Sequence, residues 1–448
     1  MPAAPCDYIK AVKEINSRGD DMPDQYTETL ARIKSHRLPG LELGDSHVHP
    51  HYGGYSILNV PASICGWLGA PLLGRAPLDQ QITGALADEY QNVILILMDA
   101  LSLDRFARWE EAGLLPVWSE LVQRGVFTPL TSITPSTTAA ALTSLWTGSS
   151  AAEHGIVGYE MWLKEYGMVI NSILHSPMSF KGEANSLSMA GFDPETFIKP
   201  QVLGTHLSRH GVQVYAYQHH SITGSGLSRM LLQEVNRQPF RTQSDLWVNA
   251  RSVLEDNPGQ RKYIWIYWGE VDYMSHNYGP DDERTISEFT RFSSTLEQLL
   301  LSQLSASTRK DTLLILLADH GQIKSQPDPH YDLSNHPNLV RRLHIMPTGE
   351  NRLVSLFPRP GQSEAVREYI ERTWPDQFLF LDPTYAVECG LFGPGEPHPR
   401  LYDRLGDLIV ISREESYLWW SPKADHLFGR HGGLSADEML VPFLAVEL

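Results

Sequence analysis

Residues 92–99, Asn-Val-Ile-Leu-Ile-Leu-Met-Asp, form an apolar run that ends in a single acid, Asp99. The run has the length of one strand, and it contains no polar residue between Val93 and Met98. Strands that are apolar on both faces are typical of parallel sheets covered by helices on both sides. This stretch therefore predicts an α/β fold.

Two further apolar runs lead to acids in the same way. Residues 263–268 lead to Asp272, and residues 313–318 lead to Asp319 and His320. From Ala85 onward such runs alternate with helical patterns, which predicts a doubly wound, mainly parallel central sheet with helices on both faces. Because the carboxyl ends of parallel strands lie at one edge of a sheet, the three acids are expected to converge there.

Interruptions of this alternation of strands and helices predict how the chain is divided into domains. Residues 1–80 are polar and then rich in Gly and Pro, and we interpret them as an N-terminal arm that wraps the body. Residues 331–423 predict a small α+β insertion, with strands at 352–357, 377–381 and 407–412 and a helix at 363–373. The catalytic domain then comprises residues 81–330 and 424–448, and the apolar run 439–446 returns to the main sheet.

The charge of the chain limits its partners. A formal net charge of -17 repels phosphate backbones, so duplex nucleic acid and anionic membrane surfaces are not expected partners. An anionic small-molecule substrate would need local cations, which favours bound metal ions. The oligomeric state does not follow from these features.

The cysteines and the N-terminus predict the cellular location. The three cysteines, Cys6, Cys65 and Cys389, are widely spaced and odd in number, which does not indicate a disulfide framework. The first 16 residues lack the apolar core of a secretory signal, and no stretch approaches the roughly 20 apolar residues that span a bilayer. We therefore expect a soluble, cytoplasmic protein.

Six residues at the strand ends and in a late glycine-flanked turn have side chains that bind metals. They are Asp99, Asp272, His276, Asp319, His320 and His431. Carboxylate and imidazole without thiolate suit zinc, and also manganese or iron, and six ligands suggest two ions. A single Asp or His of this kind usually caps a helix or makes ordinary hydrogen bonds, but six in this order favour a metal centre.

Hydroxyl side chains crowd into residues 131–138, just ahead of an alanine-rich helical segment that leads to Thr147 and Gly148. A hydroxyl at a helix N-terminus meets free N–H groups and the positive end of the helix dipole, which favour phosphate and an attacking alkoxide. A cluster of helix caps is the alternative, because Ser and Thr are common at that position.

These motifs together resemble the alkaline phosphatase superfamily and, within it, the type I phosphodiesterase and nucleotide pyrophosphatase branch. The matching segments are Leu-Met-Asp-Ala at 97–100, Thr-Pro-Ser-Thr-Thr at 134–138, Thr-Gly at 147–148, Glu-His-Gly-Ile-Val-Gly at 153–158, Glu-Val-Asp-Tyr-Met-Ser-His at 270–276, Ala-Asp-His-Gly at 318–321 and His-Gly-Gly at 431–433. Their order along the chain agrees with the family.

The resemblance implies two metal sites around a threonine nucleophile. The ligands would be Asp99, Asp319, His320 and the oxygen of Thr138 for one ion, and Asp272, His276 and His431 for the other. Thr138 is chosen by its spacing from Thr147-Gly148, and its neighbour Thr137 is the alternative. His154 is interpreted as part of a structural turn.

The expected activity is hydrolysis of phosphodiester or nucleotide pyrophosphate bonds through a phosphothreonine intermediate. Close nucleotide pyrophosphatases carry an asparagine three residues after the nucleophile, where this chain has Ala141, so the substrate class stays open. Phosphomonoester and phosphonate hydrolysis are the alternatives within the superfamily.

Two other interpretations come from different classes of protein. His47 and His49 form a His-x-His pattern that resembles the first strand of an amidohydrolase barrel, although no apolar strand precedes it. An inactive scaffold is the second alternative, and the complete set of ligands argues against it. The aromatic segments 215–220 and 417–420 could border a base-stacking pocket, but such residues are more often core.

Overall fold

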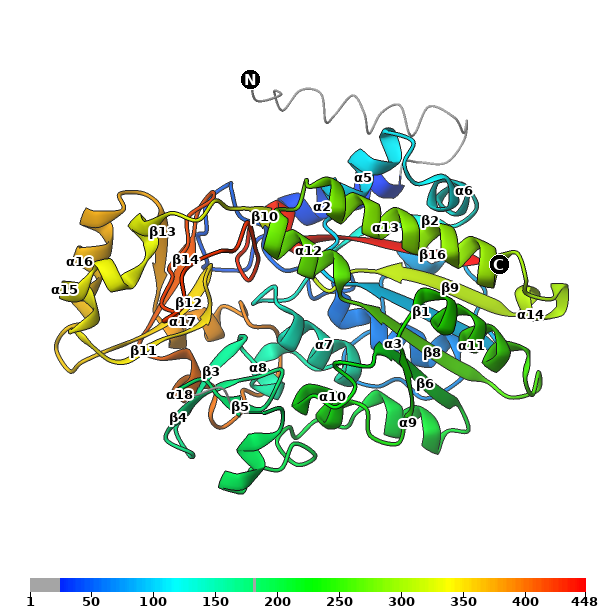
Figure 1. Cartoon of the computed structure of the whole chain (residues 1–448), viewed down its shortest axis with the longest axis horizontal. Helices are drawn as coiled ribbons and strands as arrows, with labels where there is room; N and C mark the ends of the chain where they lie inside the picture. Colours follow the sequence, from blue (N-terminus) through cyan, green and yellow to red (C-terminus); the bar gives the residue numbers. More distant parts are fainter. Residues whose placement is uncertain (1–24, 180–182) are drawn as a thin grey trace.

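The computed structural model describes residues 25–179 and 183–448. Its centre is a seven-stranded sheet in the order β2-β16-β9-β1-β8-β6-β7 (Figure 1). The bounds are β1 (Asn92–Met98), β2 (Val126–Thr131), β6 (Gln213–His219), β7 (Asn236–Phe240), β8 (Lys262–Trp268), β9 (Thr312–Leu317) and β16 (Leu440–Glu447). Neighbouring strands pair in parallel except at β16, which is antiparallel to β2 and β9. The predicted fold class is confirmed.

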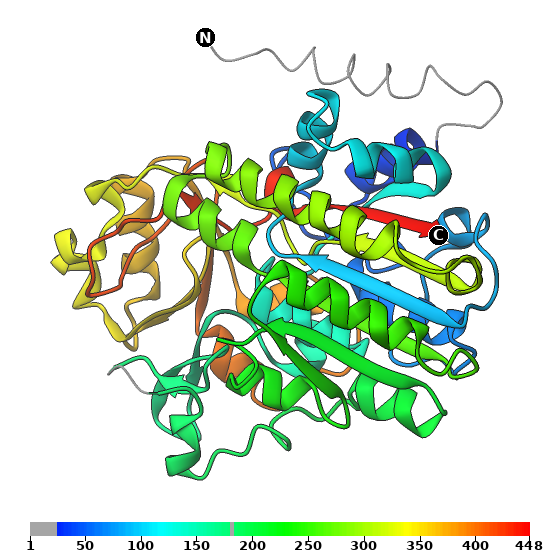
Figure 2. The ribbon, with the colours of Figure 1, turned by 45° about the vertical axis from the view of Figure 1, so that its right-hand side comes forward.

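Helices cover both faces of this sheet (Figure 2). On β8, Trp265 contacts Trp146 of α7 (Thr138–Thr147) with ring centroids 5.2 Å apart, whereas Trp268 contacts Phe292 of α13 (Glu283–Leu296) at 4.9 Å. Side chains alternate along a strand, so α7 and α13 lie on opposite faces. The layer of α7 includes α3 (Val60–Trp67), α9 (Leu203–Arg209) and α10 (Gly226–Leu231); that of α13 includes α5 (Leu103–Glu111), α6 (Pro116–Arg124) and α11 (Gln243–Glu255).

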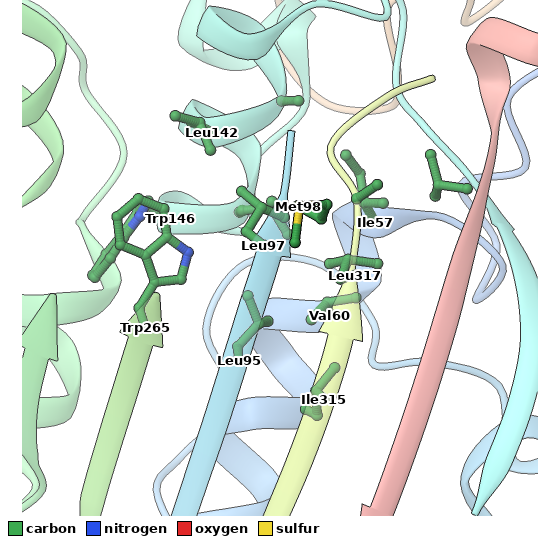
Figure 3. Close-up of a cluster of buried hydrophobic side chains, with 14 of the residues drawn as sticks. Ile57, Val60, Leu95, Leu97, Met98, Leu142, Trp146, Trp265, Ile315 and Leu317 are labelled. Carbon is green, nitrogen blue, oxygen red and sulfur yellow. The ribbon is translucent and has the colours of Figure 1, made fainter. Parts of the chain in front are cut away.

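The main core lies on both faces of the sheet, against the α7 layer and the α13 layer, and residues 30–82 contribute to it. All seven residues of β1 are buried. Figure 3 shows Ile57 and Val60 beside Leu317 of β9, and both N-terminal residues are fully buried. The segment that we interpreted as a wrapping arm thus supplies core residues along its described length, from Ile33 and Leu43 to Ile57 and Val60. Residues 1–24 of the predicted arm lie outside the described residues.

A second seven-stranded sheet, in the order β13-β14-β12-β11-β3-β4-β5, lies beside the first (Figure 1). Its strands are β3 (Glu160–Leu163), β4 (Met168–Asn171), β5 (Ser176–Pro177), β11 (Leu343–Glu350), β12 (Leu353–Pro358), β13 (Phe378–Leu381) and β14 (Leu408–Ser412). Four of them, together with α16 (Ser363–Thr373), fall within the predicted insertion. The other three come from residues 160–177 and join through the single pair Gly349 and Glu160, a long-range pairing with no local sequence signal.

Shorter elements complete the fold and bring chain segments to the carboxyl edge of the main sheet. Helix α12 (Glu270–Tyr278) follows β8, and β10 (Ile323–Lys324) follows β9. β10 pairs with β15 (Gly429–Arg430), which precedes β16 in the chain. The remaining elements include α2 (Gln25–Ser35), α4 (Gln80–Thr83), α8 (Ala151–His154), α14 (Ala306–Lys310), α15 (Pro337–Val340), α17 (Pro383–Glu388), α18 (Leu401–Leu405) and α19 (Ala436–Met439). Across the described ranges, no helix is both long enough and apolar enough to cross a membrane.

Candidate metal centre

The first group of potential ligands lies where β1 and β9 end. Asp99, Asp319 and His320 are buried, and one ligand atom of each lies within 4.8 Å of the others. Ala100 turns the chain after β1 with a left-handed φ of 59° and donates its N–H to Asp319 Oδ1 over 3.2 Å. The N–H of His320 donates to the same oxygen over 3.0 Å. Two backbone donors thus fix Asp319 and leave its Oδ2 facing the group.

The second group joins α12 to the turn after β15. Asp272, His276 and His431 also place one ligand atom each within 4.8 Å of the others. Nε2 of His276 lies 3.2 Å from Asp272 Oδ1, because a spacing of four puts both on one face of the helix. Nε2 of His431 lies 3.9 Å from the same oxygen. Gly432 follows with a φ of 105°, and a Cβ there would lie 2.3 Å from the Glu350 side chain.

All three histidines of the two groups are oriented by backbone carbonyls. Nδ1 lies 2.9 Å from the Gly321 carbonyl in His320, 2.8 Å from that of Gly429 in His276 and 3.2 Å from that of Ser136 in His431. A carbonyl only accepts, so Nδ1 carries the proton and the lone pair of Nε2 points toward the carboxylates. Metal-binding histidines are held in this way.

The electrostatics of the first group call for a cation. Burial, and then the neighbouring acids Asp319 and Asp272, raise the pKa of Asp99 well above its ordinary value. Burial also raises the pKa of Asp319. Asp99 Oδ1 and Asp319 Oδ2 are buried and have no hydrogen-bond partner among the described residues. Buried carboxylate oxygens without donors fit a bound divalent metal ion.

In the second group, the pKa of the acid shifts in the opposite direction to the pKa values of Asp99 and Asp319. Burial opposes the charge of Asp272, but the adjacent His276 outweighs it and lowers the Asp272 pKa. Burial lowers and Asp272 raises the pKa of His276, with a net increase. Burial, and then His320, lower the pKa of His431 well below its usual value. The two groups adjoin, because the rings of His320 and His431 stack with centroids 4.0 Å apart.

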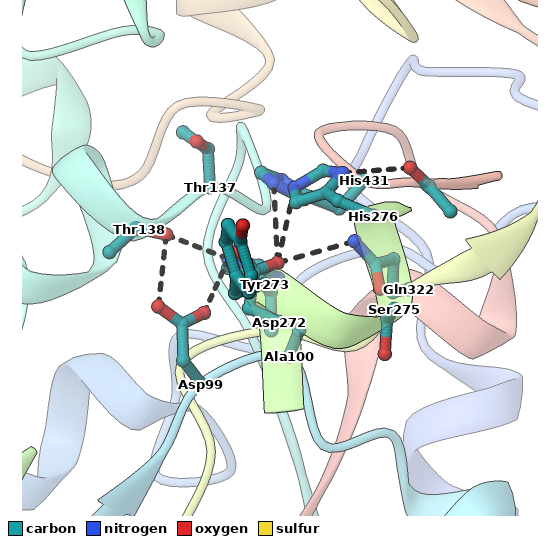
Figure 4. A network of polar contacts seen from close by, with 12 residues as sticks. Asp99, Ala100, Thr137, Thr138, Asp272, Tyr273, Ser275, His276, Gln322 and His431 are labelled. Atoms are coloured by element: carbon teal, nitrogen blue, oxygen red, sulfur yellow. Dashed lines mark hydrogen bonds and ion pairs between the residues drawn. The ribbon is translucent and has the colours of Figure 1, made fainter. Parts of the chain in front are cut away.

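Thr138 lies at the first group, at the start of α7 (Figure 4). Its Oγ1 donates toward Asp99 Oδ2 over 3.5 Å and lies 3.2 Å from Nε2 of His320. Thr137 is the N-cap residue, and its hydroxyl points elsewhere, donating to Glu350 Oε1 over 2.6 Å. The geometry therefore distinguishes the two threonines, whose sequence context is alike. Only Thr138 contacts the ligand group.

Sequence analysis missed two side chains at this site. Tyr267 of β8 donates its hydroxyl to Asp99 Oδ2, the oxygen that Thr138 approaches. Glu350 of β11 accepts from Thr137 and from the Tyr159 backbone N–H, the latter over 2.7 Å, and burial raises its pKa to about 7. Tyr267 was detectable as the residue that faces α7 nearest the end of its strand. No sequence pattern indicates Glu350, because it reaches the site through the packing of the second sheet.

Two other positions that the sequence singled out, His154 and Ala141, are both fully buried. His154 is fully buried, with Nε2 3.1 Å from Ser144 Oγ, as its interpretation as a structural residue predicts. Ala141 is fully buried and belongs to the main core.

The His-x-His pattern lies apart from the two ligand groups, whereas Tyr417 and Trp419 pack against Arg430, the residue before His431. His47 and His49 are buried, and the His47 nitrogens lie 2.8 Å and 3.1 Å from the carbonyls of Leu43 and Ser412. Among the described residues, neither histidine joins a potential metal group. Tyr417 is fully buried beneath Arg430, whose guanidinium lies 3.6 Å from the ring centroid.

Comparison with known families decides the classification. The model of the type I phosphodiesterase / nucleotide pyrophosphatase family matches residues 93–434. The chain belongs to this family. Both ligand groups and Thr138 lie within the matched region.

Individual relatives are distant. Human ectonucleotide pyrophosphatase/phosphodiesterase family member 5 is 20% identical over 167 residues, 37% of this chain and 33% of the relative. The bis(5'-adenosyl)-triphosphatase enpp4 of Xenopus laevis is 22% identical over 183 residues, 41% of this chain and 38% of the relative. The matches thus span 33% and 38% of the two curated relatives.

Solved structures share the fold. An inactive variant of murine ectonucleotide pyrophosphatase/phosphodiesterase 5 in complex with AMP has a TM-score of 0.58 at 18% identity and covers 79% of this chain and 87% of its own. Phosphonoacetate hydrolase from Sinorhizobium meliloti in complex with phosphonoformate has a TM-score of 0.56 at 18% identity, with coverages of 79% and 89%.

Proposed function

We propose that this protein is a metal-dependent hydrolase that cleaves phosphodiester or nucleotide pyrophosphate bonds, with Thr138 as the nucleophile. The observation that carries the proposal is the convergence of two carboxylate and imidazole groups beside the hydroxyl of Thr138. Family membership supports phosphoester hydrolysis as the reaction class.

The proposed ligands follow from the two groups. Asp99, Asp319 and His320 would hold one divalent ion near Thr138 Oγ1, and Asp272, His276 and His431 would hold a second. Zinc suits these ligands best, and manganese and iron are compatible with them. Bound ions would supply positive charge that offsets the charge developing on the phosphoryl oxygens and would lower the pKa of a hydroxyl or water.

The side chains of the chain position the nucleophile. Asp99 and His320 orient Thr138 Oγ1, and the Asp99 carboxylate stands where it can accept the hydroxyl proton. Thr138 Oγ1 forms a bond to phosphorus while the bond from phosphorus to the leaving oxygen breaks, which gives a phosphothreonine. The free N–H groups of the first turn of α7 would donate to the phosphoryl oxygens of a bound substrate. Water then cleaves the phosphothreonine and restores Thr138.

The proposed substrate is a small molecule with a phosphodiester or pyrophosphate link. The curated relatives are named for nucleotide pyrophosphatase, phosphodiesterase and bis(5'-adenosyl)-triphosphatase activity, which supports this choice. Phosphomonoester and phosphonate hydrolysis are the second candidates, since a phosphonoacetate hydrolase shares the fold. A cytoplasmic location is also proposed, and the cysteine pattern supports it.

The test combines elemental analysis with a substrate panel. Purified protein is analysed for metals and assayed with bis-p-nitrophenyl phosphate, p-nitrophenyl phosphate and phosphonoacetate, each with and without a chelator. We expect two metal ions per chain and chelator-sensitive cleavage of the diester. Preference for the monoester or the phosphonate would replace the proposed substrate class, and metal-free protein without turnover would favour the scaffold interpretation.

A further inference from the structure

Arg105 is a buried cation beneath the two ligand groups. It lies on α5, six positions after Asp99, and only 1% of its surface is exposed. Nη1 donates to Ser275 Oγ over 3.1 Å and Nη2 to the Gln322 carbonyl over 3.3 Å. Within the described residues no carboxylate pairs with Arg105 directly, and its guanidinium carbon lies 5.8 Å from the centroid of the Trp109 ring. A buried guanidinium is costly, so its retention without a direct counter-ion needs a reason.

The two acceptors of Arg105 belong to the segments that carry different ligand groups. Ser275 lies on α12 immediately before His276, whereas Gln322 lies two positions after His320. The Ser275 hydroxyl also donates to the Val271 carbonyl over 2.7 Å, which fixes it to its own helix. Arg105 therefore ties the helix of the second group to the turn of the first.

Gln322 makes a second connection, this time to a ligand side chain. Its Nε2 donates to Asp272 Oδ1 over 3.2 Å (Figure 4), and 2% of its surface is exposed. Its Oε1 lies 2.9 Å from the position that a Cβ on Gly429 would occupy. The amide is thus held between Asp272 and Gly429, whose carbonyl orients His276. A residue of the first segment therefore sets the orientation of a carboxylate in the second group.

We propose that Arg105 and Gln322 are positioning residues that fix the separation and relative orientation of the two ligand groups. This inference rests on the proposed function, because it concerns the two ions that the groups would hold. Partners of this kind act through the ligands, and their loss typically weakens metal affinity 10- to 100-fold. The positive charge of Arg105 also interacts with Asp272, a ligand of the second group.

The test measures the metal centre directly and does not depend on turnover. The protein, Arg105→Met, Arg105→Lys and Gln322→Met are titrated with Mn²⁺ against a chelating indicator, and the spin coupling between bound ions is recorded by electron paramagnetic resonance. The unmodified chain should bind two coupled ions. Arg105→Met and Gln322→Met should weaken the affinity for one of the two ions by roughly 10- to 100-fold and abolish the spin coupling. Arg105→Lys keeps the positive charge and should retain part of the affinity and part of the coupling.

Arg404 provides the matched control. It is as buried as Arg105, at 1% exposure, and donates Nη1 to the Gly155 carbonyl over 2.6 Å, in a region that holds no ligand of either group. Arg404→Met should lower the melting temperature without changing Mn²⁺ affinity or coupling. If Arg105→Met behaves in the same way, Arg105 has only a structural role and the inference is overturned. If the unmodified chain binds neither Mn²⁺ nor Zn²⁺, the proposed function and the inference both fail.

Discussion

Thr138 Oγ1 lies 3.2 Å from Nε2 of His320, although 182 positions separate the two residues in the chain. The contact exists because α7 begins over the carboxyl ends of β1 and β9. It brings a hydroxyl at a helix N-terminus to a buried acidic group, the arrangement that a metal-assisted nucleophile needs.

Replacement of the proposed nucleophile should separate chemistry from metal binding. Thr138→Ala should reduce diester hydrolysis by on the order of 10³-fold or more, because a nucleophile and its partners act as a unit. The protein should still bind its metal through Asp99, Asp319 and His320. Steady-state kinetics and elemental analysis on the same preparation check both expectations.

Thr137→Ala is the control for that experiment. The Thr137 hydroxyl donates to Glu350 and not to a ligand residue, so its removal should cost less than tenfold in rate, on the order of one lost hydrogen bond. A severe loss in Thr137→Ala together with near-normal turnover in Thr138→Ala would reverse the assignment.

Asp99→Asn should affect the stability of the metal-free protein and of the metal-loaded protein in opposite directions. Without metal, Asp99 is a buried acid whose neighbours Asp319 and Asp272 repel its charge, so the variant should be at least as stable as the original chain. Metal at about 1,000 times its Kd should stabilise the original chain by about 4 kcal/mol and the variant by much less. Melting curves with chelator and with Zn²⁺ measure both effects, and a clearly less stable metal-free variant would contradict the electrostatic argument.

The buried pair of Arg352 and Glu438 should make stability depend on pH. Nε of Arg352 donates to Glu438 Oε1 over 2.7 Å, and both side chains are fully buried. Burial opposes ionisation of Glu438, but Arg352 and hydrogen bonds from Ser435 and Gly433 outweigh it and lower its pKa. This stabilisation is complete above the pKa of the unfolded chain and is lost as pH falls through the lower folded value.

Glu438→Gln tests that expectation. It should cost about 3 kcal/mol or more at pH 7, since it leaves a buried guanidinium unpaired, and should flatten the loss of stability below pH 4.5. Urea unfolding across this range measures the slope. An unchanged slope in the variant would mean that other carboxyl groups control the acid response.

Gly321 should not tolerate a side chain. A Cβ at this position would lie 2.0 Å from the Asp437 carbonyl oxygen and 2.6 Å from the Ser102 Cβ, so the turn that carries Asp319 and His320 would have to move. Gly321→Ala should cost about 1–3 kcal/mol and weaken metal binding. Gly259→Ala, with no atom within 4 Å of the added Cβ, is the control and should change stability by less than about 0.5 kcal/mol. Equal effects in both variants would refute the steric argument.

The sequence by itself determined the sheet and the residue types at its carboxyl edge. The runs ending near Asp99, Asp272 and Asp319 are apolar on both faces, which only a covered parallel sheet accommodates, and parallel strands bring their ends together. The spacing of four between Asp272 and His276 likewise fixes one helical face, and α12 shows it. These features are local or follow from strand direction, so no knowledge of distant contacts was needed.

Only the tertiary structure decided which side chains surround those ends. Glu350 contacts Thr137 from the second sheet, whose two parts pair only at Gly349 and Glu160. The periodicity of neither segment predicts that pairing. Arg105 and Gln322 acquire their roles from hydrogen bonds across 170 and 50 positions of chain. A sequence pattern records the period of one element, whereas these contacts depend on how separate elements pack, so they emerge only once the chain is folded.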